Sequence, residues 1–387
     1  MKYRTLGKTG RKVSVLGYGC MRLPTRDQGE QFTYPNGPIN REEAIRLIRM
    51  AIDAGVNYVD TAYNYHDDES ERVLGEALKE GYREKVTLET KAPIWKEEYN
   101  KPEHFEEHLD EQLEKLQVDC IDVYLLHSLN KNNWKKAQEL NLIERAEKAK
   151  EEGKINHFGF SFHDSPEVLK EIIDSDWFEV MLVQYNILDQ VNEEMIKYAG
   201  EKGMGVLIMG PNGGGRLAGK APENMKKWLT EGRENFVDLA MKFVWKNPHV
   251  SVALSGMGSE LMVTDNLALA SGEKYDNLTE DEKERIEALG TKIKELTEQI
   301  CTQCRYCQPC PNEVNIPLIF GLMIHSQIYG NETAAKWAYS NIGNSRWFPG
   351  KNATACVECG ECEPKCPQKI PIIEQLKDAH ELLTANE

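Results

Sequence analysis

The sequence lacks the features that mark membrane, secreted and nucleic-acid-binding proteins. In its 387 residues no apolar run reaches the length of a membrane span, and no apolar core of the signal-peptide type follows the first few residues. Basic residues are outnumbered, with 47 Lys and Arg against 63 Asp and Glu, which gives a formal net charge of −16. That balance argues against nucleic acids and anionic membranes as partners. We therefore expect a cytoplasmic protein whose partners are small molecules or other proteins.

Cysteine is scarce in most of the chain. Of the ten cysteines, Cys20 and Cys120 stand apart, and the other eight lie between Cys301 and Cys366. In a chain without a secretion signal, such crowding indicates metal binding rather than a disulfide framework. We expect Cys120 to be a small buried hydrophobe, and Cys20, which is next to a strand end, to line a pocket.

A complete glycine-rich phosphate turn is also missing. The segment Gly17-Tyr-Gly19-Cys-Met-Arg lacks the third glycine of the Rossmann fingerprint, which argues against an open, doubly wound sheet. Instead, short apolar strands alternate with amphipathic helices along the chain. The expected strands are residues 13–16, 56–60, 86–90, 121–126, 155–161, 180–184, 205–209 and 250–255. This alternation predicts an α/β fold, a (β/α)8 TIM barrel.

Polar side chains stand at the carboxyl ends of three successive expected strands. Asp60 closes the strand at 56–60 and Tyr65 follows in the loop, while Lys91 and His127 end the next two strands. In a parallel barrel these ends meet on one face. A Lys91 ammonium would lower the pKa of the Tyr65 phenol from its usual value of about 10. Asp60 would hold Lys91 charged, and His127 would hydrogen-bond the oxygen of a bound carbonyl.

Each of these residues also has an ordinary structural interpretation. Asp60 and Lys91 make a plausible ion pair, Tyr65 an amphipathic loop aromatic, and His127 a satisfied histidine at a strand end. Their convergence at the ends of three successive strands favours a site that polarises a ketone or an aldehyde.

The order and spacing of these residues resemble a known family. The pattern Asp60-x4-Tyr65, then Lys91, then His127 is similar to the catalytic tetrad of the aldo-keto reductase superfamily. Gly55 and the segments 3–10, 15–19 and 71–78 are also similar to that family. The resemblance covers residues 1–272 and counts 13–16 as the first strand. It implies that the barrel interconverts a carbonyl and an alcohol, with Tyr65 as general acid and base.

The resemblance also implies a nicotinamide cofactor, NAD(P)(H), at the strand ends. Ser161 and Gln184 stand where the family binds the carboxamide, although Phe162 replaces the frequent asparagine. Gly256 and Met262 stand where Lys and Arg often hold a 2′-phosphate, so NADH is not disfavoured, and a flavin stays possible. The residues expected to bind the cofactor are Cys20, Met21, Ser161, Gln184, Met209, Gly210, Gly256, Gly258 and Asn266.

The last part of the chain has two cysteine runs. The second, Cys356-x2-Cys359-x2-Cys362-x3-Cys366, has the full bacterial ferredoxin spacing, and the first is one residue shorter. Two such runs fit two 4Fe-4S clusters better than a four-ligand zinc site. By ferredoxin logic the two ligand sets are Cys301, Cys304, Cys307, Cys366 and Cys356, Cys359, Cys362, Cys310. The intervening segment, residues 312–351, is longer than a minimal ferredoxin loop and contains candidate helices, so the domain resembles the α-helical ferredoxin type.

These patterns predict three parts. Residues 1–275 form the barrel, and residues 276–300 form an amphipathic linker helix that opens with the capping box Thr279-x-x-Glu282. Its apolar face, expected to pack on the barrel, consists of Ile286, Leu289, Ile293, Leu296 and Ile300. Residues 301–387 form the ferredoxin-like domain.

Three functions are compatible with this organisation. The first is an aldo-keto reductase acting on a small carbonyl or alcohol. The second is an electron-transfer oxidoreductase whose clusters exchange single electrons with a protein partner. Since nicotinamide carries hydride, this second function would require an intermediary such as a flavin. The third, a non-catalytic iron-sulfur binding subunit, is disfavoured because all four tetrad residues are present.

Overall fold

The computed structural model describes residues 1–25, 38–215, 217–221, 223–298, 301, 307–327, 332–345, 348–366 and 369–385. The chain packs into two compact units. One consists of residues 1–213 and 240–278, and the other of residues 214–239 and 279–387. Within the described ranges, none of the helices is both long and apolar enough to cross a membrane.

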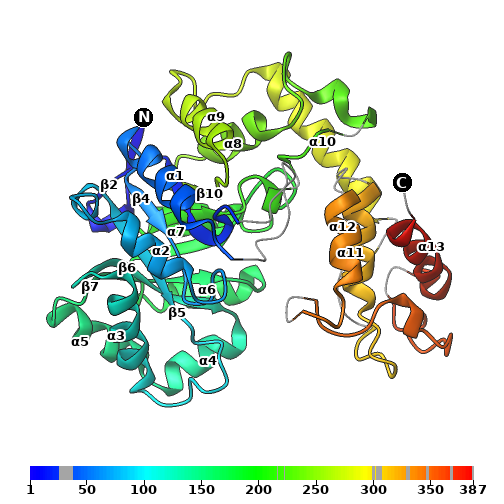
Figure 1. Ribbon diagram of the computed structural model, residues 1–387, viewed down its shortest axis with the longest axis horizontal. Coiled ribbons are helices and arrows are strands. Elements are labelled where there is room, and N and C mark those ends of the chain that lie inside the picture. The colour runs from blue at the N-terminus through cyan, green and yellow to red at the C-terminus, as the bar shows by residue number, and fades with distance from the viewer. Residues whose placement is uncertain are drawn as a thin grey trace. The chain divides into compact units, whose positions relative to one another are not determined.

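The first unit is built on a closed barrel of eight parallel strands (Figure 1). The strands are β3 (Leu16–Gly19), β4 (Tyr58–Asp60), β5 (Thr87–Ala92), β6 (Ile121–Leu129), β7 (Ile155–Phe162), β8 (Val180–Gln184), β9 (Gly205–Met209) and β10 (Val252–Ser255). They follow one another around the barrel in chain order, and β10 closes it against β3. The expected TIM barrel is therefore confirmed.

The first expected strand, residues 13–16, is wrong as a single element. Two short strands, β1 (Tyr3–Thr5) and β2 (Lys12–Ser14), form an antiparallel hairpin, and the barrel strand β3 begins only at Leu16. The apolar run was misassigned because it serves two elements. Val13 and Leu6 are fully buried in the core inside the barrel, and Leu6 packs on Gly205 at the start of β9. The hairpin therefore covers the amino ends of the strands, opposite the expected site.

Helices α1 to α8 lie in the connections between the barrel strands, and α9 follows the last strand. They are α1 (Arg41–Asp53), α2 (Ser70–Ala77), α3 (His104–Leu116), α4 (Lys131–Glu139), α5 (Leu142–Glu151), α6 (Pro166–Asp174), α7 (Glu193–Glu201), α8 (Val237–Trp245) and α9 (Glu260–Ser271). Short 3-10 turns are η1 (Gly7–Thr9), η2 (Cys20–Arg22), η3 (Arg83–Lys85) and η4 (Gly213–Gly215). The buried side chains of α4 are Trp134 and Ala137. Asn130 begins this helix by accepting a hydrogen bond from the N–H of Asn133 (2.9 Å).

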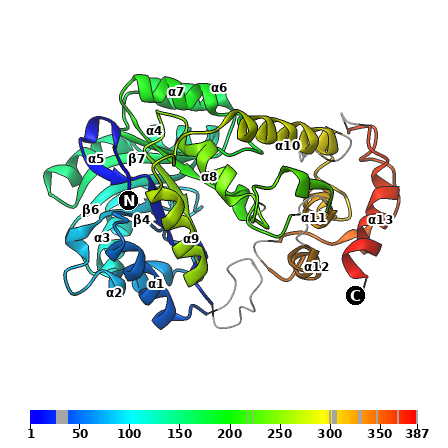
Figure 2. The same cartoon turned by 90° about the horizontal axis from the view of Figure 1, so that it is seen from above.

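The second unit contains the long helix α10 (Glu280–Glu298), shown along its length in Figure 2. Its capping box forms as expected: the N–H of Thr279 donates to Glu282 (2.8 Å) and the N–H of Glu282 donates to the Thr279 hydroxyl (3.2 Å). Of the expected apolar face, Ile286 and Leu289 are buried. The side chains of Ile293, Leu296 and Ile300 lie outside the described residues.

Residues 214–239, which follow β9 and which we expected in the barrel domain, belong to the same unit as α10. Their turn η5 (Glu223–Trp228) packs against α10, and Arg285 Nη1 donates to the backbone oxygen of Leu229 (2.5 Å). The linker helix is thus attached to the long connection after β9.

The rest of the second unit is helical, with α11 (Ile316–Gln327), α12 (Glu332–Ser340), α13 (Ile372–Thr384) and the turn η6 (Ala353–Ala355). The three helices pack on a shared core that includes Ile319, Phe320, Tyr339 and Leu376. The cysteine-rich segments flank these helices in the sequence, so a helical scaffold supports them.

Candidate active site

Strand register explains why the expected catalytic side chains meet. β4, β5 and β6 are parallel neighbours in which Asp60 is paired with Glu89 and Lys91 with Leu125. Residues two apart in a strand face the same side, so Lys91 shares the inner face with Glu89 and His127 shares it with Leu125. Lys91 and His127 are among the last three residues of their strands. The carboxyl ends of these strands carry the candidate site.

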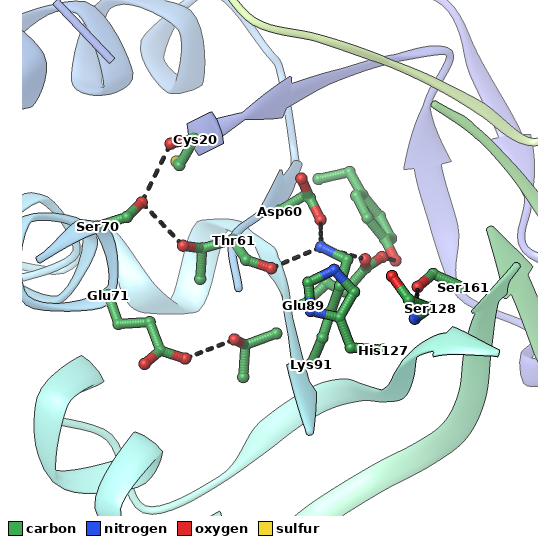
Figure 3. A network of polar contacts seen from close by, with 12 residues as sticks. Cys20, Asp60, Thr61, Ser70, Glu71, Glu89, Lys91, His127, Ser128 and Ser161 are labelled. Atoms are coloured by element: carbon green, nitrogen blue, oxygen red, sulfur yellow. Dashed lines mark hydrogen bonds and ion pairs between the residues drawn. The ribbon is translucent and has the colours of Figure 1, made fainter. Parts of the chain in front are cut away.

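The structure brings Asp60, Tyr65, Lys91 and His127 together (Figure 3 shows three of them). Lys91 Nζ donates to Asp60 Oδ1 and to the backbone oxygen of Thr61 (2.6 Å). It lies 5.1 Å from the centre of the Tyr65 ring, whose centre is 6.2 Å from that of His127. Lys91 and Asp60 are almost completely buried, and Tyr65 is half-buried.

Burial dominates the electrostatics of Tyr65. It raises the pKa of Tyr65 to about 12, although the Lys91 cation opposes this increase. The direction is therefore opposite to the lowered pKa that we expected from Lys91 alone. Burial opposes the charge on Lys91 as well, but Asp60, Tyr65 and Glu89 together raise the pKa of Lys91 well above its usual value. At neutral pH the site thus holds a protonated phenol beside a cation.

His127 is neutral in this environment. Burial lowers the pKa of His127 well below its usual value, and the positive charge of Lys91 adds to the effect. Trp95 Nε1 donates a hydrogen bond to His127 Nδ1 (3.4 Å), which leaves the imidazole proton on Nε2. We did not anticipate Trp95 from the sequence. Its position four residues after Lys91, in the loop that follows β5, was the available signal.

Glu89 is a second residue that the sequence interpretation missed. It is fully buried, with Oε1 at 3.4 Å from Lys91 Nζ, and its Oε2 accepts a hydrogen bond from the Tyr58 hydroxyl (2.5 Å). The sequence did contain a signal for this residue: Glu89 precedes Lys91 by two residues, and residues two apart in a strand face the same side. A carboxyl group therefore lies beside the ion pair of Lys91 and Asp60.

All but one of the residues expected to bind the cofactor come from strand ends on the same side of the barrel, and Asn266 lies on helix α9. Ser161 Oγ accepts from the Ser128 N–H (2.8 Å), Gln184 Nε2 donates to Asp189 (2.8 Å), and Asn266 Nδ2 donates to Ser255 Oγ (3.1 Å). The remaining ones also follow strand ends: Cys20 and Met21 after β3, Met209 and Gly210 at the end of β9, and Gly256 and Gly258 after β10.

Two arginines lie where the sequence suggested a lack of cations. Arg46 of α1 pairs with Glu260 of α9 (2.8 Å) and also with Glu43. The side chain of Arg22 packs so closely on Gly256 that a Cβ there would lie 2.9 Å from Arg22 Cβ. Because both arginines are distant from Gly256 and Glu260 in the sequence, local reading did not find them.

Sequence comparison agrees with the barrel fold. Residues 15–290 match the sequence model of the aldo/keto reductase family. The chain belongs to this family. The resemblance that the tetrad spacing suggested is thereby confirmed, and the chain is an oxidoreductase of the aldo-keto reductase type.

Several aldo-keto reductases and related enzymes are similar to this family member. L-galactose dehydrogenase of Arabidopsis thaliana is 26% identical over 318 residues, which cover 77% of this chain and 97% of the plant protein. NADH-specific methylglyoxal reductase of Escherichia coli strain K12 is 28% identical over 240 residues, covering 57% and 70%. The solved holo form of an aldo-keto reductase from Bacillus halodurans has a TM-score of 0.62 at 28% identity and covers 74% of this chain and 96% of that one.

This aldo/keto reductase family member also has an iron-sulfur domain, because residues 300–370 match a 4Fe-4S dicluster domain. Five cysteines line one cavity: Cys307, Cys310, Cys356, Cys359 and Cys362. Among the described residues, no three His, Cys, Asp or Glu side chains converge on a position for a single metal ion. A donor set made of thiols around one cavity fits an iron-sulfur cluster.

The cavity contains one complete expected ligand set, Cys310 with Cys356, Cys359 and Cys362. Cys307, which we expected in the other set, lines it as well. Cys301 and Cys366 pack against the helical core of the domain, and Cys304 lies outside the described residues.

Proposed function

We propose that the barrel interconverts a carbonyl and an alcohol, with Tyr65 as general acid and base. The observation that carries this proposal is the convergence of Tyr65, Lys91, Asp60 and His127 at the carboxyl end of three neighbouring strands. A protonated phenol is suited to give a proton to a carbonyl oxygen during reduction. The Lys91 cation then stabilises the phenolate that remains, and Asp60 holds Lys91 in place.

His127 has a complementary role in the proposal. As a neutral imidazole with its proton on Nε2, it donates a hydrogen bond to the carbonyl oxygen and fixes the substrate beside Tyr65. Trp95 keeps the proton on Nε2 by occupying Nδ1. The partly exposed Trp95 ring also forms part of the site next to His127.

A bound nicotinamide would supply the hydride. Ser161 and Gln184 offer the polar groups for its carboxamide, and the Met209–Gly210 and Gly256–Gly258 segments would hold the rest of the dinucleotide. Arg46 is paired with two carboxylates, Glu43 and Glu260, and even when Arg22 beside Gly256 is included this group of four has no net positive charge for a 2′-phosphate. We infer that NADH binds at least as well as NADPH, and the NADH-specific relative supports this choice. Titrating both dinucleotides tests it, and a clear preference for NADPH would refute it.

A pair of tyrosines in one loop provides the test of the catalytic assignment. Removing a general acid lowers the rate by about 10²- to 10⁴-fold, so Tyr65→Phe should lose that much of the kcat for carbonyl reduction. Tyr63→Phe is the matched control, because the Tyr63 hydroxyl is bonded to Glu111 (3.1 Å) and does not join the site. Wild-type turnover in Tyr65→Phe would remove Tyr65 from the mechanism.

A second candidate function is electron transfer through the iron-sulfur domain. It is favoured by the exposure of Cys359 and its neighbour Val357, both in the lining of the cysteine cavity, which gives a protein partner access to that site. Coupling to hydride chemistry would require a flavin. The visible spectrum of anaerobically purified protein distinguishes these cases, since cluster absorbance and flavin bands differ.

Thiolate-bound clusters suit a reducing compartment, so a cytoplasmic location stays a prediction.

A further inference from the structure

We propose that Glu89 is a positioning residue of the barrel site, which keeps a proton shared with Asp60 and thereby leaves the charge of Lys91 available to Tyr65. The role in the reaction rests on the proposed function. The position of the proton does not, because it follows from the contacts of Glu89 itself.

The barrel register places Glu89 among groups that all face inward. Asp60 is the register partner of Glu89 across β4 and β5, and Tyr58 precedes Asp60 by two residues. On the other side, β6 offers Val123 as the register partner of Glu89. Val123 and Tyr58 belong to the apolar core inside the barrel, so the Glu89 carboxyl stands at the edge of that core.

Two carboxyl groups meet one ammonium here. Lys91 Nζ hydrogen-bonds Asp60 Oδ1 and the Thr61 backbone oxygen, but it is 3.4 Å from Glu89 Oε1, and that oxygen has no hydrogen-bond partner. If both carboxyl groups were ionised, a fully buried site would hold an uncompensated negative charge, which is strongly unfavourable.

A proton on Glu89 removes the uncompensated negative charge and gives Oε1 a hydrogen bond to make. The Tyr58 hydroxyl already donates to Oε2, so the proton belongs on Oε1. Glu89 and Asp60 are cross-strand register partners that both approach Lys91 Nζ, so their carboxyl groups are neighbours, and two acceptors can hydrogen-bond only if one of them carries a proton. Burial, together with the neighbouring Asp60, raises the pKa of Glu89 well above its usual range, in agreement with this arrangement.

The shared proton determines how strongly Lys91 acts on Tyr65. The groups that face Glu89 are Tyr58 and Asp60 on β4 and Lys91 on β5, with Tyr65 in the loop after β4. A negative charge on Glu89 raises the pKa of Tyr65, which opposes the effect of Lys91. A neutral Glu89 leaves Asp60 and Lys91 as a balanced pair and preserves the stabilisation of the phenolate.

Infrared spectroscopy tests the proton directly. At about pH 9, roughly two units above the pKa of about 7 of Glu71, wild-type protein should show the carbonyl stretch of a protonated carboxyl group, and Glu89→Gln should lack it. Glu71→Gln is the matched control, because Glu71 is another fully buried glutamate whose band should vanish as the pH passes about 7. Identical spectra of wild type and Glu89→Gln at this pH would overturn the proposal.

Kinetics test the positioning role. Glu89→Gln copies the neutral carboxyl, so its kcat at neutral pH should stay within about threefold of wild type. Because glutamine cannot ionise and raise the pKa of Tyr65, the alkaline limb of the pH–rate profile should lie at lower pH than in wild type. Glu89→Ala removes the support of Asp60 and Lys91 and should lose about 10²-fold. Equal losses in both variants, with unchanged circular dichroism, would overturn the positioning role. Absence of carbonyl reduction in the wild type would refute the proposed function, and the infrared result would still decide the proton.

Discussion

Glu71 gives a stability prediction that depends on pH. It lies on α2 without solvent exposure, and its Oε1 accepts hydrogen bonds from Thr90 (2.6 Å) and Gln112 (2.5 Å). Oε2 has no partner. Gln112 also donates to the backbone oxygen of Lys91 (3.2 Å), so this network supports β5 from outside the barrel. The change to test is Glu71→Gln, which copies the uncharged form.

The magnitude follows from the raised pKa. Burial raises the pKa of Glu71 from 4.5 to about 7, so the folded protein binds more protons than the unfolded chain between these values. The stability from this group is fully present below the unfolded pKa and is lost as pH rises through about 7. At about 1.4 kcal/mol per unit, the loss amounts to about 3 kcal/mol in the free energy of unfolding.

Urea unfolding under anaerobic conditions, followed by tryptophan fluorescence, measures this effect at pH values below 5 and above 8. Wild type should lose about 3 kcal/mol more than Glu71→Gln across this interval. Glu84→Gln, which changes an exposed glutamate in η3, should follow the wild-type curve. If Glu71→Gln and wild type show the same pH dependence, the burial argument for Glu71 is refuted.

Three further predictions concern the two sites. Lys91→Met removes the cation beside Tyr65, so the phenol pKa should rise further above about 12 and kcat should fall by about 10²-fold or more; ultraviolet titration and turnover measure both. Trp95→Phe removes the donor to His127 Nδ1, so nitrogen NMR of this variant should detect a mixture of imidazole tautomers, and its kcat should be roughly tenfold lower. If nitrogen NMR of the wild type placed the imidazole proton on Nδ1, this prediction would be contradicted. Anaerobic protein should contain about eight iron and eight sulfide per chain if both cysteine runs hold cubanes, whereas stoichiometric zinc without sulfide would exclude them.

The sequence by itself determined the barrel and the chemical groups of its site. Strand alternation and the positions of Asp60, Lys91 and His127 near strand ends were sufficient, because parallel strands bring all their carboxyl ends to one face. The cysteine runs likewise predicted the iron-sulfur domain, since ligand spacing is a local property of the sequence. The apolar run at 13–16 was ambiguous because it gives the same local signal for one strand as for the end of a hairpin followed by a barrel strand.

Only the tertiary structure decided which residues of the site contact one another. The contact of Glu89 with Asp60 depends on strand register, and the bond from Trp95 to His127 depends on the path of a loop. The pKa of Tyr65 moves upward because burial outweighs Lys91, and burial is set by the whole fold. Arg22 likewise reaches Gly256 because the closing strand β10 pairs with β3. Register, burial and barrel closure are non-local properties, and so residue spacing along the chain does not reveal them.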